Sequence, residues 1–579
     1  MGATVIPTSR GTGLRVGLFP IVALAVVAAC GPAGSGGGAN DAAPQAPAPS
    51  RTLLFAIRVE PESLSFKGAH QGQTTLTTVR SLFNANLALV DDTGTWQPAL
   101  AEALPQLNTD AWSLMPDGRM ETTYRLRAGL AWHDGTPLMA SDFAFAWRVY
   151  THPGLGQANL TPQGLMDEVI AQDERTLLIR WARPFPDAGM LHNNFPPQPA
   201  HLLQAALDQG VDAFGSSPYW TRDYVGLGPY RLTRWEPGAF IEGEANPSYL
   251  FGRPKIDRVR VSFFGDPNVA VTTLLADEVH VLADVTIRSS ELPFLRRDWI
   301  PRGAGTVLLT PLIYRSAHVQ LRPALAAPST LLDLRVRRAL AHALDKQAIN
   351  DAIYDGAGIM ADTIVPPQMW YFAQVDRAIN RYPNDIRRTE QLMAEAGYSR
   401  AADGVFTHAA QGRFRAELRT NASSQFEAEM HIIGDGWRRA GFDFSEAITP
   451  SALVQDAQFR TSFSGVYIFG FPVDFGETPL RSYHSRNIPR EENRWLGSNR
   501  GGWINEEWDR LAPTYDSTLD RDQRAEIAIQ LARIYSEEVP AIPISLDPDV
   551  IAHVAALRGP RAAPPGGAVA WNIHEWELR

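Results

Sequence analysis

The sequence predicts a mixed α/β fold with more than one lobe. Residues 51–579 greatly exceed the length of an ordinary domain, which is about 100–150 residues. Hydrophobic residues make up 45% of the chain, and 15 Trp, 15 Tyr and 25 Phe are enough to fill large cores. Strand-like and helix-like segments are mixed along this length without a detectable repeat, which is typical of helices packed on sheets.

The first half of this region contains two alternations typical of strands and one well-marked helix. Residues 123–127 and 259–263 alternate apolar with polar side chains, as half-buried strands do. Asp134 and Gly135 predict a turn, and Ser141 is a suitable N-cap for the helix that follows. The apolar stripe of this helix contains Phe143, Trp147 and Tyr150.

Three further helices and a strand are predicted in the second half. A helix that begins after Asp333 buries a face made of Val336, Leu340, Ala343 and Leu344. Another helix runs from about Arg387 to Gly397, and a third begins near Asp520 and ends before Pro540. Residues 541–546 predict an extended strand at a sheet edge, because proline cannot donate a hydrogen bond to a neighbouring strand.

Cys30, the only cysteine, directly follows a hydrophobic leader that ends in Val27-Ala28-Ala29. The apolar run 16–29 has the length of a signal peptide, and basic residues precede it without any acidic residue. A cysteine directly after small residues resembles a bacterial lipobox, in which the thiol receives a diacylglycerol. We therefore expect an exported protein that is lipid-anchored to the outer face of the cytoplasmic membrane, in the periplasm or at the cell surface. The alternative is an accidental or buried cysteine.

The segment after Cys30 is expected to be a flexible tether. Residues 31–50 contain only Gly, Pro, Ala, Ser, Asn, Asp and Gln, a composition that cannot bury a core. A coil of this length has a root-mean-square span of about 25 Å. We therefore divide the N-terminal region into a signal peptide, 1–29, and a lipidated cysteine with its linker, 30–50.

The charge of the chain argues against nucleic acid as a partner. The formal net charge is −10, and it falls to −12 when the leader with Arg10 and Arg15 is removed. A surface that binds a polyanion needs a basic stripe. The basic run 335–338 lies on a predicted helix, where a solvated face explains it. With one cysteine, the chain cannot form an intrachain disulfide.

Several segments, in order along nearly all of the mature chain, resemble the peptide/nickel-type (family 5) solute-binding proteins of ABC importers. The most specific segment is 124–137, which reads YRLRAGLAWHDGTP. The other matching segments are 60–64, 96–102, 226–230, 235–238, 246–249, 333–340, 394–398 and 501–505. One departure concerns the ligand side of the family's structure, because Ser65-Phe66 replaces the usual Asp-Pro.

The resemblance implies a periplasmic-binding-protein-like α/β fold with two main lobes around a hinged cleft and an extra domain in the first half. The expected pieces are 51–84, 219–312 and 533–579 for lobe I, 85–218 for the extra domain, and 313–532 for lobe II. Because the chain crosses between the lobes repeatedly, we expect closure around ligand to be a hinge motion.

No residue pattern typical of an enzyme is found in the sequence. His133-Asp134 is the strongest candidate pair, but beside a glycine turn we expect Asp134 to bind its own backbone. Gly226 and Gly228 lack the third glycine of a dinucleotide loop, and residues 574–577 lack a third metal ligand. We therefore expect no catalysis, no metal and no cofactor. A surface-anchored hydrolase or an adhesion scaffold is the alternative class of function.

The resemblance also implies a receptor that captures a solute and presents it to the permease subunits of an ABC transporter. Peptide-binding members have an acidic residue after an apolar stretch in lobe II, and it pairs with the α-ammonium of the ligand. Here Phe469, Gly470 and Phe471 precede Asp474 at that position. A carboxylate can hold an ammonium through charge-assisted hydrogen bonds. The alternative is that Asp474 only caps a turn before Gly476.

The ligand-facing strand of lobe I is expected near His70, Gln71 and Gly72, where glycine permits close approach of a ligand backbone. Phe471 and Phe475 fit a core role equally well. We expect an oligopeptide ligand. An oligosaccharide is the second candidate, because tryptophans stack on sugar rings. The small number of histidines argues against nickel. The expected partners are this ligand, the permease and, through the lipid, the membrane, and the protein itself is expected to be a monomer.

Overall fold

The computed structural model describes residues 51–68, 76–454, 456–473 and 478–579. The chain divides into two units, Met1–Pro49 and Ser50–Arg579, and the second is compact by itself. Cys30, Gln71, Gly72 and Asp474 lie outside the described residues, as do His70 and Phe475.

An eleven-stranded mixed sheet forms the framework of the second unit. Its order is β18-β17-β19-β12-β20-β11-β1-β10-β9-β8, with β13 paired to β20. The strands are β18 (Asp443–Thr449), β17 (Arg415–Asn421), β19 (Val466–Pro472), β12 (Gly305–Val319), β20 (Ala541–Val554), β11 (Val281–Ile287), β1 (Thr52–Ile57), β10 (Arg258–Phe263), β9 (Phe240–Ala245), β8 (Tyr230–Glu236) and β13 (Ile359–Met360).

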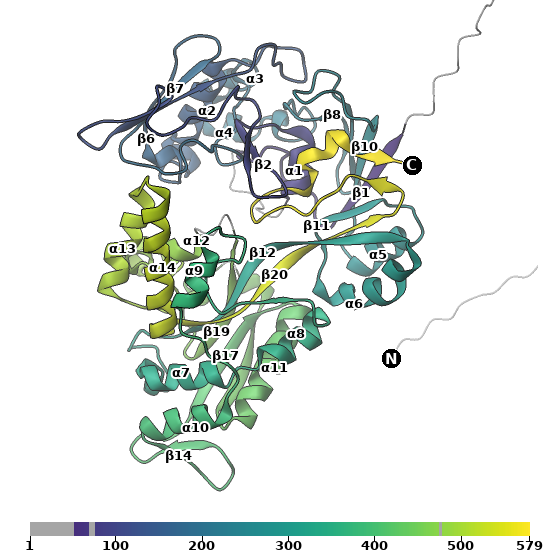
Figure 1. Cartoon of the computed structure of the whole chain (residues 1–579). Coiled ribbons are helices and arrows are strands. Elements are labelled where there is room, and N and C mark those ends of the chain that lie inside the picture. The colour runs from purple at the N-terminus through teal and green to yellow at the C-terminus, as the bar shows by residue number, and fades with distance from the viewer. Residues whose placement is uncertain (1–50, 69–75, 455, 474–477) are drawn as a thin grey trace, which may run out of the picture. The chain divides into compact units, whose positions relative to one another are not determined.

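Two long antiparallel strands, β12 and β20, link the halves of this sheet (Figure 1). β20 contributes Val550 to one hydrophobic cluster, Ile542 to a second and Leu546 to a third. The pairing of β12 with β20 is interrupted between Pro311 and Ile313, where the register shifts. These two strands are therefore the shared element of otherwise separate cores.

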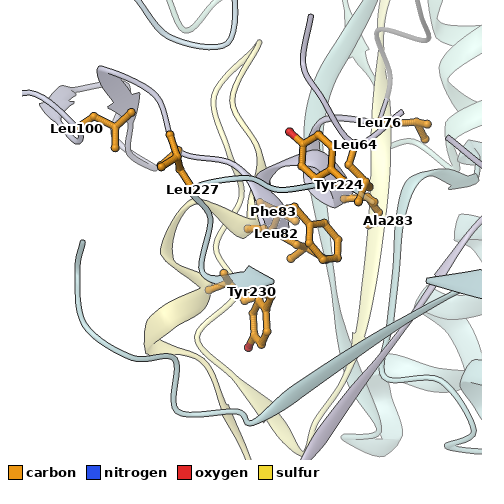
Figure 2. Close-up of a cluster of buried hydrophobic side chains, with 14 of the residues drawn as sticks. Leu64, Leu76, Leu82, Phe83, Leu100, Tyr224, Leu227, Tyr230 and Ala283 are labelled. Atoms are coloured by element: carbon orange, nitrogen blue, oxygen red, sulfur yellow. The ribbon is translucent and has the colours of Figure 1, made fainter. Parts of the chain in front are cut away.

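The first hydrophobic cluster extends from Leu53 to Trp299 in sequence and continues in residues 550–576. Figure 2 shows part of it, where Leu82 and Phe83 lie near Tyr230. Gly228 packs directly on the backbone of Phe83, because a Cβ at Gly228 would lie 2.3 Å from the carbonyl carbon of Phe83. The second and third clusters lie within residues 314–546.

The remaining strands form four small sheets. They are β4 (Trp112–Leu114), β5 (Met120–Arg125), β7 (Thr176–Trp181) and β6 (Met166–Ala171) in one; β2 (Ala88–Val90) and β3 (Trp96–Pro98) in another; β14 (Tyr398–Arg400), β15 (Phe406–His408) and β16 (Gly412–Arg413) in a third; and β21 (Leu557–Arg558) and β22 (Glu577–Leu578) in the last.

Helices cover both halves of the chain. They are α1 (Thr77–Phe83), α2 (Ala140–Tyr150), α3 (Ala200–Asp208), α4 (Val211–Gly215), α5 (Pro267–Leu275), α6 (Leu292–Phe294), α7 (Leu334–His342), α8 (Lys346–Tyr354), α9 (Phe372–Ala378), α10 (Ile386–Glu395), α11 (Ser424–Arg439), α12 (Thr478–Ser482), α13 (Glu506–Ser517) and α14 (Arg521–Glu538). Within the described residues, no helix is long and apolar enough to span a membrane.

The predicted helix ends in the second half are confirmed. Asp333 caps α7 by accepting from the N–H of Arg335 at 2.9 Å, and Asp520 caps α14 by accepting from Gln523 at 2.8 Å. Gly397 follows α10 with a φ of +88°, a left-handed conformation that glycine adopts without strain. The domain boundaries remain predictions, and α14 continues through the one expected at 532–533.

The predicted N-cap of α2 is wrong. The helix begins at Ala140, and the cap position is Met139 rather than Ser141. The side chain of Asp142 accepts from the N–H of Met139 at 3.0 Å, so an acidic residue in the first turn satisfies the free backbone donor instead. Phe143 and Tyr150 are buried on the predicted stripe, and Trp147 is half-buried.

The prediction of an edge strand at 541–546 is also wrong, because β20 lies inside the sheet between β12 and β11. One edge of β20 pairs with β12. The opposite edge pairs with β13 only through Ser545 and Leu546, and with β11 only between residues 550 and 553. Pro543 and Pro548 fall outside both pairings. Each proline therefore lies where the strand has one neighbour, although the strand as a whole is internal.

Asp134 has the expected structural role. Its carboxylate accepts from the N–H of Thr136 at 3.0 Å, and His201 Nε2 lies 2.8 Å from its other oxygen. His133 is within hydrogen-bond distance of the Gly228 carbonyl, at 3.0 Å, and accepts from the N–H of Gly226 at 3.2 Å. His133 and Asp134 thus connect their turn to the segment that contains Gly226 and Gly228.

Candidate ligand-binding site

The end of β19 leaves one edge of a strand unpaired among the described residues. On one side, the whole of β19, from Val466 to Pro472, pairs with β12. On the other side, parallel β17 pairs only with the first three residues, Val466 to Ile468. Residues 469–472 therefore present a strand edge to which no described strand is bonded, and it leads directly into the segment that contains Asp474.

This edge lies at the carboxyl ends of parallel strands. β17 and β18 run parallel, and their last residues Asn421 and Thr449 pair with each other. β19 is parallel to β17 and extends beyond it. In open α/β sheets, ligands bind outside the carboxyl ends of the strands. Residues 469–472 thus lie at the end of the sheet where ligands of open α/β folds bind.

Gly470 has a structural reason to be glycine. A Cβ at this position would lie 2.3 Å from Cγ2 of Ile313 and 2.8 Å from the carbonyl oxygen of Tyr314 on the neighbouring strand. The close contact is therefore with β12 itself.

Phe469 and Phe471 are buried in the third hydrophobic cluster, with 2% and 6% of their surfaces exposed. The ring of Phe469 stacks on His318 at a centroid distance of 3.7 Å, and Tyr483 lies on His318 at 5.8 Å. Burial lowers the pKa of His318 well below its usual value, so this imidazole is neutral at pH 7. Phe471 therefore packs in a core, which is the alternative stated for it, and Phe469 packs there too.

Two neighbouring arginines, Arg500 and Arg460, have no carboxylate partner among the described residues, and Arg500 contacts this aromatic group. The guanidinium of Arg500 lies 4.2 Å from the centre of the Phe469 ring. Burial, together with the nearby charge of Arg460, lowers the pKa of Arg500 to about 10. Neither side chain forms an ion pair among the described residues, and the Nε of Arg460 is buried without a hydrogen-bond partner there. Both arginines are half-buried, and a partly desolvated cation favours an anionic partner.

The second predicted segment, near His70, Gln71 and Gly72, lies within the undescribed residues 69–75, and the residues just before them are described. The carbonyl of Gly68 accepts from Gln157 Nε2 at 2.9 Å. Lys67 donates to Gln163 Oε1 at 2.6 Å and to the Asn194 carbonyl at 3.0 Å. Burial lowers the pKa of Lys67 to about 7. These bonds fix the chain on the N-terminal side of the segment.

Helix α1, directly after this segment, is held by a carboxylate from another strand. Asp284 accepts from the N–H groups of Thr78 and Val79, both at 2.9 Å. Asp284 and Val285 have φ values of +53° and +62°, in the left-handed region that a β-branched residue rarely adopts. Asp549 of β20 accepts from the N–H of Val285 at 2.8 Å.

A buried polar cluster at the register shift of β12 and β20 is missed by the sequence analysis. Arg315 forms an ion pair with Glu429, and its guanidinium lies 3.8 Å from the centre of the Phe426 ring. Asp547 accepts from Gln425 Nε2 at 2.8 Å and lies 3.8 Å from Arg288. The available signal was the presence of Asp547 and Asp549 in an otherwise apolar, proline-containing strand.

The profile of bacterial extracellular solute-binding proteins, family 5, matches residues 97–484 of this sequence. The chain belongs to this family. Family 5 proteins are extracytoplasmic proteins that bind solutes for transport, and the resemblance seen in the sequence is confirmed.

Relatives of the family 5 chain include proteins named for peptide binding. The oligopeptide-binding protein AppA of Bacillus subtilis is 21% identical over 521 residues, 89% of this chain and 90% of that protein. The dipeptide-binding protein of Escherichia coli is 23% identical over 521 residues, 86% of this chain and 89% of that protein. A putative ABC transporter peptide-binding protein of Brucella ovis is 25% identical over 296 residues, so the match spans about half of each chain, 50% and 51%.

Solved structures confirm the two-lobed binding-protein fold of this family 5 member. NikA of Brucella suis, in complex with Fe(III)-EDTA, aligns with a TM-score of 0.74 at 17% identity, covering 92% of this chain and 100% of that one. AppA of Bacillus subtilis, with a nonapeptide, aligns with a TM-score of 0.68 at 20% identity, covering 92% and 100%. At these identities the likeness establishes the fold.

Proposed function

We propose that this family 5 protein is a lipid-anchored receptor that binds an oligopeptide outside the cytoplasmic membrane and delivers it to an ABC permease. The observation that supports the peptide is the unpaired edge of β19 at residues 469–472. An extended peptide adds a strand to such an edge through main-chain hydrogen bonds, which do not depend on the side chains of the ligand.

We further propose that charged side chains near this edge complement a zwitterionic ligand. Asp474 follows the edge in sequence and is proposed to pair with the free ammonium of the peptide. Arg460 and Arg500, to which no described residue supplies an ion-pair partner, are proposed to attract its carboxylate or an acidic side chain. Gln71 and Gly72 are proposed to contact the ligand backbone from the other lobe. The relatives named for oligopeptide and dipeptide binding agree with this class of ligand.

Within the described residues, no group of three His, Cys, Asp or Glu side chains is placed to hold a metal ion. The proposal therefore favours a peptide over a bare metal ion.

Native mass spectrometry of residues 50–579, mixed with a peptide library and with an oligosaccharide library, tests the proposed function. We expect a stoichiometric complex with a chemically unchanged peptide. A bound oligosaccharide would move the assignment to sugars, and a cleaved peptide would indicate a hydrolase. The absence of a complex with either library would favour a scaffold.

A further inference from the structure

A cavity of about 570 Å³ lies where the C-terminal segment meets residues 251–258. Four basic side chains line it, from two regions far apart in sequence, together with two acidic ones. The basic residues are Arg253, Lys255, Arg558 and Arg561, and the acidic ones are Glu575 and Glu577. The chain as a whole has a net charge of −10, so its composition does not predict a basic cavity.

Three of the four basic side chains have a carboxylate partner, and Arg253 pairs with Asp257 at 2.6 Å. Lys255 pairs with Glu577 at 2.7 Å, and Arg561 lies 3.6 Å from Asp92. The side chain of Arg558, at the end of β21, has no ion-pair or hydrogen-bond partner among the residues that the structure describes. Arginine and lysine in such a concave place are the donors that suit a phosphate group.

One carboxylate joins the wall of this cavity to the point where the linker enters the folded unit. Asp257 accepts from Arg253 at 2.6 Å and from the backbone N–H of Arg51 at 3.1 Å. Arg51 is the first residue after the linker, which has a root-mean-square span of about 25 Å. If Cys30 is lipidated, this end of the unit is tethered within reach of the membrane surface.

We propose that this cavity binds the phosphate of an anionic phospholipid headgroup, so that this end of the receptor rests on the membrane beside its anchor. The proposal rests on the proposed lipid-anchored function. The negative potential of an anionic membrane attracts basic side chains, and each one near the surface strengthens binding about fivefold. Such docking would hold the receptor in one orientation for the permease.

Vesicle co-sedimentation of residues 50–579, which form a compact unit without the anchor, tests the proposal. We expect binding to vesicles of phosphatidylglycerol in phosphatidylcholine and none to phosphatidylcholine alone. The double variant Arg558→Glu, Arg561→Glu should reduce this binding by at least about tenfold, from the fivefold contribution of each cation. The affinity of this double variant for peptide, measured by calorimetry, should stay unchanged. The peptide measurement therefore tests the receptor function independently of vesicle binding.

The double variant Arg387→Glu, Arg439→Glu is the matched control, because it makes the same charge change at exposed positions on α10 and α11. We expect it to retain binding to anionic vesicles. Equal losses in both double variants would show a non-specific charge effect and overturn the proposal. Absence of vesicle binding by the unaltered protein would also overturn it, as would competition by inorganic phosphate at the concentration of the lipid headgroup, which would indicate a free-anion site.

Discussion

Arg524 Nη1 donates to Asp187 Oδ1 at 2.9 Å, across 337 residues of sequence. Arg524 lies in α14, which packs in the third hydrophobic cluster, whereas Asp187 belongs to the region predicted as the extra domain. Leu519, just before α14, packs against the first cluster. The two side chains are therefore part of a contact between regions with separate cores.

Loss of this ion pair should weaken ligand binding, if the contact belongs to the closed form. Arg524→Ala and Asp187→Ala should each lower affinity by up to about fivefold, since a partly exposed pair contributes about 1 kcal/mol or less. The double variant should lose less than the sum of the two single losses, because the shared ion pair is counted in both single variants, although Arg524 also contacts the ring of Tyr515. Calorimetry measures the affinities, and solution scattering with and without ligand measures closure.

Arg533→Ala on the same helix is the control for this cycle, because Arg533 pairs locally with Glu537. We expect its affinity and its scattering profile to match the unaltered protein. A scattering profile that does not change at saturating ligand would exclude the hinge motion, and additive losses in the double variant would exclude coupling between Arg524 and Asp187.

Asp474 should distinguish peptides with a free amine from acetylated ones. Asp474→Asn should weaken binding of a free-amine peptide by about 2–5 kcal/mol, because a desolvated ammonium loses its partner. The acetylated form of that peptide should bind poorly to the unaltered protein and lose little more in the variant. Calorimetry of both peptides with both proteins gives the four affinities, and equal losses would show that Asp474 does not bind the amine.

Removal of one partner from the buried Arg315–Glu429 pair should destabilise the fold. Both side chains are 3% exposed, so Glu429→Gln leaves a guanidinium without its counter-ion in the interior. We expect a loss of about 3–5 kcal/mol in the free energy of unfolding. Replacing both residues by methionine should cost much less, because no buried charge remains. Urea unfolding measures both variants, and a loss below about 1 kcal/mol for Glu429→Gln would contradict the expectation.

Stability should fall as pH rises from about 4 to about 7, because of Asp284. Burial, and then the nearby Asp549, raises the pKa of Asp284 to about 7. Burial raises the pKa of Asp549 to about 6. A carboxyl group with a higher pKa in the folded state binds more protons when folded, so deprotonation destabilises the fold. Each unit of pKa difference corresponds to about 1.4 kcal/mol, so the total loss is a few kcal/mol.

Asp549→Asn removes the neighbouring negative charge and should lower the pKa of Asp284. The free energy of unfolding in urea, measured across this pH range, should then fall less steeply than in the unaltered protein. Asp110→Asn, at an exposed position, is the control and should leave the slope unchanged. The charged groups that face the pair are Arg80, Arg288 and Asp547. An identical slope in Asp549→Asn would contradict the expectation, because both the titration of Asp549 and its effect on Asp284 are removed in this variant.

Cys30→Ala should abolish lipid attachment and leave the folded unit unchanged. The three hydrophobic clusters consist of residues from Leu53 onward, so we expect the melting temperature of the mature body to be preserved. Metabolic labelling with palmitate checks the anchor. Equal labelling of the variant and the unaltered protein would exclude the lipobox interpretation.

The sequence by itself determined the features that depend on neighbouring residues. The caps at Asp333 and Asp520, the stop at Gly397 and the turn at Asp134 follow from local hydrogen bonding and backbone freedom. Ordered motifs along the chain were enough to identify the family, because such motifs are read in one dimension.

The tertiary structure decided the features that depend on which distant segments meet. The prolines of β20 predicted an edge, but pairing with β12, β11 and β13 places the strand inside the sheet. Three pairs of side chains join positions that are more than one hundred residues apart. They are Arg315 with Glu429, Asp284 with Asp549, and Arg524 with Asp187. Local propensity does not contain this information, since burial and charge pairing depend on the packing of whole elements.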